Sequence, residues 1–159
     1  MRCVSQVSPE PIKDMTEIRF LVPETPKGKA RPRFSTWSGQ VRTYTPESTK
    51  QFENLVHWYS KQAMGERHPF PKEVPVSVDV KACFPVPSSY SKKKREACLN
   101  GTIKHTKKPD CDNVLKAVCD PMNKTVFWDD SQVFQTSVEK VYCDGNRGYL
   151  EIVVKAYEE

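Results

Sequence analysis

Apolar residues recur along the chain with two spacings, and each spacing predicts a different kind of element. Alternation of apolar and polar positions is typical of strands with one buried face. It occurs in four longer segments: residues 16–22, 74–84, 133–142 and 149–157. A shorter apolar run at 125–128 predicts a short strand or hairpin arm. Because 133–142 and 149–157 are joined by the turn sequence Asp144-Gly145-Asn146, we expect them to pair as an antiparallel hairpin.

Residues 34–44 predict a separate hairpin that turns at Ser38 and Gly39. Two of its aromatic residues, Trp37 and Tyr44, could stack on nucleic-acid bases, but we expect them to pack inside the protein.

Helical spacing of apolar residues predicts two helices, over residues 45–64 and 112–122. A plausible cap at Ser91 and an end signal at Asn100-Gly101 predict a short basic helix over residues 91–99. Thr45 and Pro46 form a start signal for the first, because proline is favoured at the first helical position. Its inward face consists of Phe52, Leu55, Val56 and Tyr59. Helices packed on one face of a small mixed sheet define an α+β class. We therefore expect one domain over residues 16–159, preceded by a flexible arm at residues 1–15.

Composition narrows the class of protein further. Of the 159 residues, 37% are hydrophobic and 28% are charged, which is ordinary for a water-soluble domain. There is no apolar run long enough for a membrane span or a signal peptide, so we expect a cytoplasmic protein. The six cysteines are scattered without a CxxC pair, which favours reduced thiols over a zinc site or a disulfide framework.

The net charge of +5 is unevenly distributed. Residues 27–50 hold six basic residues and one glutamate, and residues 92–108 hold seven basic residues and one glutamate, so the remainder of the chain is acidic. Two basic segments on either side of an acidic centre suit a polyphosphate that is led to a metal site. The alternative is that both basic segments are ordinary solvated loops.

The acidic centre is the stretch from Lys107 to Gln132, which holds five aspartates: Asp110, Asp112, Asp120, Asp129 and Asp130. Carboxylates at this density suggest a site for a hard cation. The helix over 112–122 puts Asp112, Lys116 and Asp120 on one face, because they are spaced by four residues. Asp110 can converge with Asp112 only if it precedes the helix, and a return of Asp129 and Asp130 would complete a cluster of three or four carboxylates. Alternatively, these aspartates are caps, turns and a surface pair with Lys116.

The order of these residues resembles that of the RusA-type Holliday junction resolvases, many of which are encoded by phages and prophages. The acidic pattern runs Pro109-Asp110-x-Asp112-Asn113-x-x-Lys116-x-x-x-Asp120-x-x-Asn123, then Asp129-Asp130-x-Gln132, then a strand with Lys140. A basic pattern precedes it: Pro23, Pro26-Lys27, Arg31-Pro32-Arg33 and Tyr44-Thr45-Pro46. The resemblance extends from about Glu17 to the C-terminus. The sequence departs from the family at Lys124, where glycine is frequent, and at Gly28, Lys29 and Ala30, which lengthen the basic loop.

The resemblance implies a RusA-like fold, a homodimer with two active sites, and Mg²⁺-dependent cleavage of branched DNA, above all four-way junctions. Mn²⁺ is expected to substitute for Mg²⁺, and no small-molecule cofactor or membrane partner is expected. Asp110, Asp112 and Asp130 are the predicted metal ligands and Asp129 is a weaker candidate. Lys116 is expected to stabilise charge on the phosphate or leaving group, or to orient the attacking water, and Asp120 to pair with Lys116. The predicted DNA contacts are Lys27, Arg31, Arg33, Lys92, Lys93, Lys94, Lys107 and Lys108.

Two other functions stay open at this point. One is a branched-DNA-binding protein without catalysis, which would need the basic residues but not the aspartates. The other is a metal-dependent nuclease that acts on flaps or simple duplex. Cleavage of matched DNA substrates distinguishes all three.

Overall fold

The computed structural model describes residues 14–31, 33–37 and 39–158. The predicted arm lies outside these residues up to position 13, and Asp14 and Met15 already belong to the first strand. In chain order the elements are β1 (Asp14–Val22), β2 (Arg33–Trp37), β3 (Gln40–Tyr44), α1 (Glu47–Met64), β4 (Val76–Pro85), α2 (Lys92–Leu99), α3 (Cys111–Met122), the 3₁₀ helix η1 (Asp130–Gln132), β5 (Val133–Cys143) and β6 (Tyr149–Glu158). The three predicted helices and four long strands are confirmed to within two residues at their ends. Ser91 caps α2, and its side chain accepts a hydrogen bond from the backbone N–H of Lys94.

The main sheet has the strand order β1-β6-β4-β5, in which β4 and β5 are parallel and the other pairs are antiparallel. The predicted hairpin of β5 with β6 is therefore wrong, because β4 lies between them. Burial explains the order: Lys81 is the one exposed residue of β4, whereas β5 has five exposed positions. A strand that is buried along nearly its whole length belongs in the interior of a sheet, and a strand with many exposed positions is suited to its edge.

The connection from β5 to β6 crosses the end of β4. Gly148 lies in this crossing, where a Cβ atom would stand 2.2 Å from the carbonyl oxygen of Cys83. Any larger residue would push the connection away from β4.

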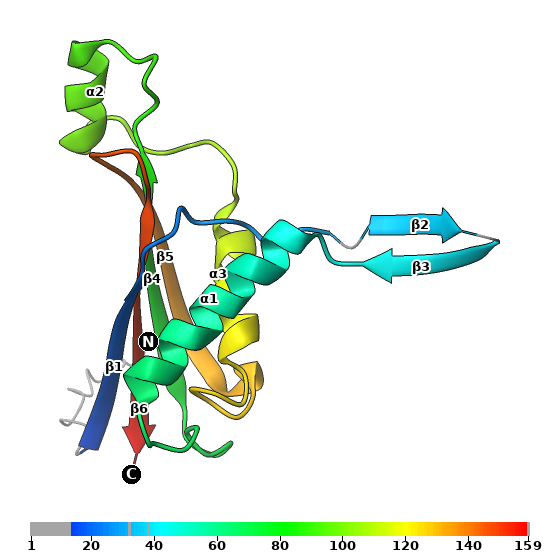
Figure 1. Ribbon diagram of the computed structural model, residues 1–159. Coiled ribbons are helices and arrows are strands. Elements are labelled where there is room, and N and C mark those ends of the chain that lie inside the picture. The colour runs from blue at the N-terminus through cyan, green and yellow to red at the C-terminus, as the bar shows by residue number, and fades with distance from the viewer. Residues whose placement is uncertain (1–13, 32, 38, 159) are drawn as a thin grey trace, which may run out of the picture.

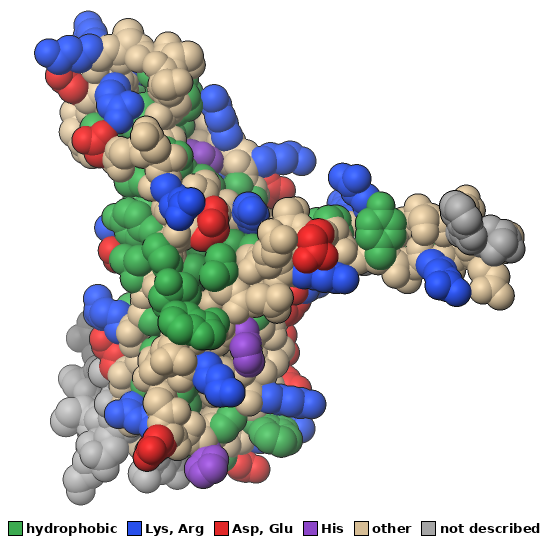
Figure 2. Space-filling view, viewed as in Figure 1, with side chains coloured by type: hydrophobic (Ala, Val, Ile, Leu, Met, Phe, Trp, Pro, Cys, Tyr) green, Lys and Arg blue, Asp and Glu red, His purple; other side chains and the backbone are tan. Residues whose placement is uncertain are grey.

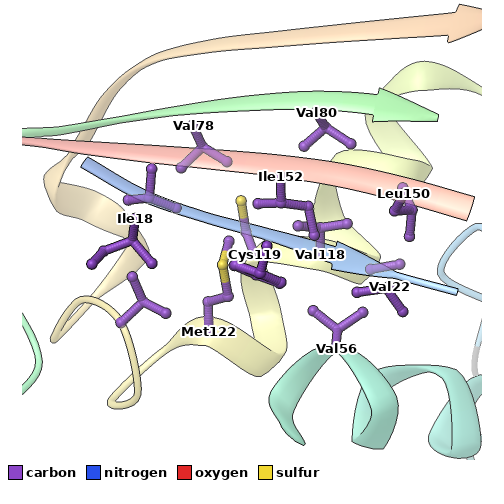
Figure 3. Close-up of a cluster of buried hydrophobic side chains, with 14 of the residues drawn as sticks. Ile18, Val22, Val56, Val78, Val80, Val118, Cys119, Met122, Leu150 and Ile152 are labelled. Carbon is purple, nitrogen blue, oxygen red and sulfur yellow. The ribbon is translucent and has the colours of Figure 1, made fainter. Parts of the chain in front are cut away.

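Both long helices lie on the same face of the sheet, and α2 lies beyond one end of it (Figure 1). The core fills the space between them, where Val56 of α1 and Val118, Cys119 and Met122 of α3 meet the apolar side chains of the strands (Figure 3). The structure thus confirms an α+β fold with helices packed on a small mixed sheet. Among the described residues, no helix has the length and apolar character needed to cross a membrane.

Two predictions about side-chain burial need correction. Leu55 is 37% exposed, because the buried face of α1 follows Thr49, Phe52, Val56, Ser60 and Met64. Tyr44 is 47% exposed instead of packed, and the side chain of Trp37 lies outside the described part of the structure.

The segment 125–128 is a turn with isolated bridges instead of a strand. Val126 and Phe127 are consecutive and both fully buried, so this turn contributes two side chains to the core. Backbone hydrogen bonds between this segment and Phe70 keep it against the core.

Candidate active site

Helix α3 begins at the centre of the acidic stretch. Asp110 is the residue that precedes the helix, with extended backbone angles, and Asp112 lies in the first turn. This is the arrangement that convergence of the two carboxylates requires. The side chain of Asp110 makes no capping hydrogen bond, so the helix does not use its carboxylate.

The backbone that leads into α3 is held by Lys140 of β5. Its Nζ donates hydrogen bonds to the carbonyl oxygens of Lys107, at 2.7 Å, and Pro109, at 3.0 Å. The sequence pattern contains Lys140, but its side chain reaches this backbone only because β5 lies beside the start of α3. Lys140 therefore fixes the position from which Asp110 projects.

The second acidic group lies on η1, which a capping box stabilises. The Asp129 carboxylate accepts a hydrogen bond from the backbone N–H of Ser131, at 2.8 Å. The side chain of Ser131, together with this backbone bond, lowers the pKa of Asp129. The Gln132 side chain completes the capping box by accepting a hydrogen bond from the backbone N–H of Asp129, at 3.0 Å. Asp129 thus has a structural task in the turn, and it fixes the direction of Asp130.

A cavity of about 330 Å³ brings α3, η1 and β5 together. Its polar lining is formed by Asp112, Lys116, Asp120 and Asp130, and the rest of the wall by Leu115, Cys119, Val133 and Thr136. Three of the four predicted catalytic residues therefore share one cavity, although Asp130 is distant from the others in sequence. Asp110 is not part of the cavity lining.

The donor atoms in this cavity suit a hard cation. Mg²⁺ is commonly bound through one or two carboxylates, with waters and substrate phosphates in the remaining positions, and Asp112 with Asp130 can supply such a pair. The neighbouring thiol does not compete, because burial, together with the charges of Asp130 and Asp120, raises the pKa of Cys119 to about 12. Within residues 14–31, 33–37 and 39–158, no three His, Cys, Asp or Glu side chains converge tightly enough to hold a metal ion. Of the five aspartates of the acidic stretch, Asp112, Asp120 and Asp130 line the cavity, and Asp110 and Asp129 do not.

The spacing of Asp120 and Lys116 predicted a pair between them, but Asp120 pairs with Lys29 instead. The Lys29 Nζ lies 2.9 Å from an oxygen of Asp120 and also binds the carboxylate of Glu53 on α1. Burial by itself would lower the pKa of Lys29, but the hydrogen bonds and charges of Asp120 and Glu53 outweigh burial and raise it. This pairing leaves Lys116 as the cation that faces the cavity from α3.

The basic loop of residues 23–31 crosses the first turn of α3. The backbone N–H of Lys29 donates to the carbonyl oxygen of Asn113, at 3.1 Å. A Cβ atom on Gly28 would lie 2.9 Å from the Cβ of Pro109, so glycine allows this close approach. The two halves of the sequence pattern, basic and acidic, therefore meet in space.

The comparison with known families is consistent with this site. The model of the family described as "Endodeoxyribonuclease RusA" matches residues 23–154, a range that contains the basic loop, the cavity and every predicted site residue. The chain belongs to the RusA family of endodeoxyribonucleases. It is also 36% identical over 143 residues to "Uncharacterized protein YqaN" from Bacillus subtilis (strain 168), and the match covers 87% of this chain and 95% of that protein.

The RusA pattern explains an unusual residue after α3. Lys124 has φ of 60°, in the left-handed region that favours glycine. This is the position at which glycine is frequent in RusA-type sequences, so the chain keeps the backbone turn although the residue has changed.

The RusA-type basic residues predicted to contact DNA, Lys27, Arg31, Arg33, Lys92, Lys93, Lys94, Lys107 and Lys108, are all exposed. They form two groups. The first follows the loop that crosses α3, and the second runs from α2 to the start of α3. In the second group the Nζ of Lys94 lies 3.8 Å from the ring centroid of Tyr90, and that of Lys107 lies 5.4 Å away. Tyr90 thus connects α2 with the segment that enters the active site.

Proposed function

We propose that this protein is a Mg²⁺-dependent endonuclease that resolves Holliday junctions in DNA recombination and repair. The observation that carries the proposal is the cavity in which Asp112, Lys116 and Asp130 meet in a RusA-family chain. We further propose that it acts in the cytoplasm as a homodimer, so that two sites cut paired strands of a four-way junction. A DNA-binding protein without catalysis would have no use for carboxylates beside a phosphate track.

Each site residue has a task in phosphodiester hydrolysis, in which an oxygen of water bonds to phosphorus while one bond from phosphorus to a sugar oxygen breaks. When bound, Mg²⁺ supplies activation of that water and stabilisation of the leaving oxygen. Asp112 of α3 and Asp130 of η1 would hold the ion. Asp110, which directly precedes α3, is the third proposed ligand. The Lys116 ammonium offsets charge on the phosphate or leaving oxygen. Leu115 and Val133 line the cavity with apolar surface, which strengthens these charge interactions.

The substitution Asp112→Asn tests the proposal most directly. Asparagine keeps the shape and removes one charge, so cleavage should fall by roughly a thousandfold or more, whereas junction binding without metal should hold or improve. Folding should be little affected, because asparagine is nearly isosteric with aspartate at this exposed position in the first turn. The measurements are single-turnover cleavage in Mg²⁺ and a binding curve in EDTA, on one folded preparation.

A matched control is Asp144→Asn, which removes a carboxylate that pairs with Arg95 in the turn between β5 and β6. It should cleave like the wild type. Near wild-type cleavage by Asp112→Asn, or full cleavage by the wild type in excess EDTA, would contradict the metal site. A panel of matched junction, fork, flap and duplex DNA decides the substrate, and equal rates on all four would exclude junction resolution as the specific activity.

A further inference from the structure

The β2–β3 hairpin stands away from the rest of the molecule (Figures 1 and 2). Every side chain that the structure describes in it is exposed, including Phe34 at 73% and Val41 at 66%. The hairpin therefore adds little to the core of this chain. A projecting ribbon whose described side chains are all exposed offers its surface for binding instead of adding to the core.

The strand register separates the hairpin into two chemically different faces. Residues directly opposite in an antiparallel pair lie on the same face, and successive pairs alternate between faces. Arg33 faces Tyr44 and Ser35 faces Arg42 on one side, which we call the arginine face. The other side, the apolar face, carries the pairs Phe34–Thr43 and Thr36–Val41.

Charge identifies the kind of partner. Residues 25–46 contain five basic residues, Lys27, Lys29, Arg31, Arg33 and Arg42, and no acidic residue. In the described structure, the ion pairs of this segment are those that Lys29 makes with Asp120 and Glu53. A segment with five basic residues and no acidic residue is complementary in charge to a polyanion.

The position of the hairpin indicates which part of the polyanion it meets. Its first strand follows the basic loop that is fixed against Pro109 and Asn113 at the start of α3. The loop that leads into the hairpin therefore lies against the first turn of α3, the turn from which Asp112 lines the cavity. Five-residue strands span about 17 Å, and a two-stranded ribbon fits the major groove, which is about 12 Å wide.

We propose, on the basis of the function proposed above, that the β2–β3 hairpin is an arm that enters the major groove of a duplex arm of the junction, with its arginine face toward the DNA. Arg33 and Arg42 donate hydrogen bonds to phosphates at the edge of the groove, and Tyr44 packs against the sugar–base surface. Arg42 and Tyr44 thus extend the DNA contact beyond the loop that holds Arg31.

The test compares two double variants that each alter one face. Arg42→Gln with Tyr44→Thr changes the arginine face, and Phe34→Thr with Val41→Thr changes the apolar face. Glutamine and threonine are tolerated in strands, and the hairpin lies outside the core, so both proteins should keep the thermal midpoint of the wild type. Binding to a four-way junction is measured in EDTA at several salt concentrations, so that no cleavage enters the result.

We expect the arginine-face variant to bind roughly tenfold more weakly or worse, with a salt dependence smaller by about one counterion. The apolar-face variant should bind within about twofold of the wild type. Equal binding by both variants and the wild type would overturn the proposal. So would weakened binding by the apolar-face variant alone, accompanied by dissociation to monomers in sedimentation, because the hairpin would then contact a second copy. If the arginine face proves necessary for binding but the wild type does not cleave, the proposed nuclease activity is wrong, whereas the proposal that the hairpin binds DNA is supported.

Discussion

At the scale of single residues, Lys29 has the widest set of interactions near the site. Its ammonium binds Asp120 of α3 and Glu53 of α1, and its backbone N–H binds the first turn of α3. One residue thus connects the basic loop to both helices. Lys29 also neutralises the carboxylate of Asp120, which lines the cavity together with Asp112. Without this pairing, Asp120 would add to the repulsion of a phosphate.

We predict that Lys29→Met destabilises the protein by about 1–2 kcal/mol, because the pair is only partly buried and its loss leaves two acids together. Lys27→Met is the matched control in the same loop, where an exposed lysine should cost less than about 0.5 kcal/mol. Urea unfolding measures both. Addition of Asp120→Asn to Lys29→Met should recover part of the loss, and equal costs for the two lysines would exclude this role of Lys29.

Sequence periodicity predicted correctly which residues of α3 line the cavity, but it did not predict the ion-pair partner of Asp120. Four-residue spacing placed Asp112, Lys116 and Asp120 on one face of α3, and all three line the cavity. The same spacing gave Asp120 the wrong partner, because Lys29 lies far away in sequence and reaches α3 only through the fold. The unusual Gly28-Lys29-Ala30 segment was the only local sign that this loop differs.

At the scale of elements, η1 is the smallest helix and depends on one buried side chain. The Gln132 Nε2 donates to the carbonyl oxygens of Pro71, at 2.9 Å, and Val74, at 2.8 Å, and its Oε1 closes the capping box with Asp129. The turn that presents Asp130 to the cavity is therefore attached to the loop before β4.

We predict that Gln132→Leu lowers the free energy of unfolding by roughly 1–3 kcal/mol, because partly buried backbone groups of Pro71, Val74 and Asp129 lose a hydrogen-bond partner. Single-turnover cleavage should fall more than binding in EDTA, since Asp130 would lose its fixed position. Gln135→Leu, at an exposed position of β5, is the matched control and should change neither quantity greatly. Undiminished cleavage by a folded Gln132→Leu protein would show that Asp130 does not need the turn.

The elements also show where local pattern stops being informative. Alternation predicted β4, β5 and β6 individually, but proximity in sequence suggested that β5 and β6 pair directly. The deciding property is that β4 is buried along nearly its whole length, with Lys81 as its one exposed residue, and it takes the interior position. Neighbour choice is a property of the whole sheet, so no single segment contained it.

At the scale of the whole molecule, symmetry gives a further prediction. A four-way junction has paired strands related by a two-fold axis, and a two-fold dimer presents matching sites to them. We expect a dimer in sedimentation and products nicked on two opposed strands. A protein that stays monomeric at micromolar concentration with and without junction DNA, or that nicks one strand at completion, would contradict paired cleavage.

The strand order has a consequence for how the chain reaches its structure. β1 is paired along its whole length with β6, and β4 pairs with β5 and β6. Both early strands can therefore pair only after the C-terminal strands have been synthesised. Such long-range contacts slow folding, because loop closure precedes any gain from pairing. During synthesis, therefore, the first two-thirds of the protein cannot assemble its sheet. The wall of the cavity formed by β5 appears late, and an unfinished chain carries the aspartates without the site.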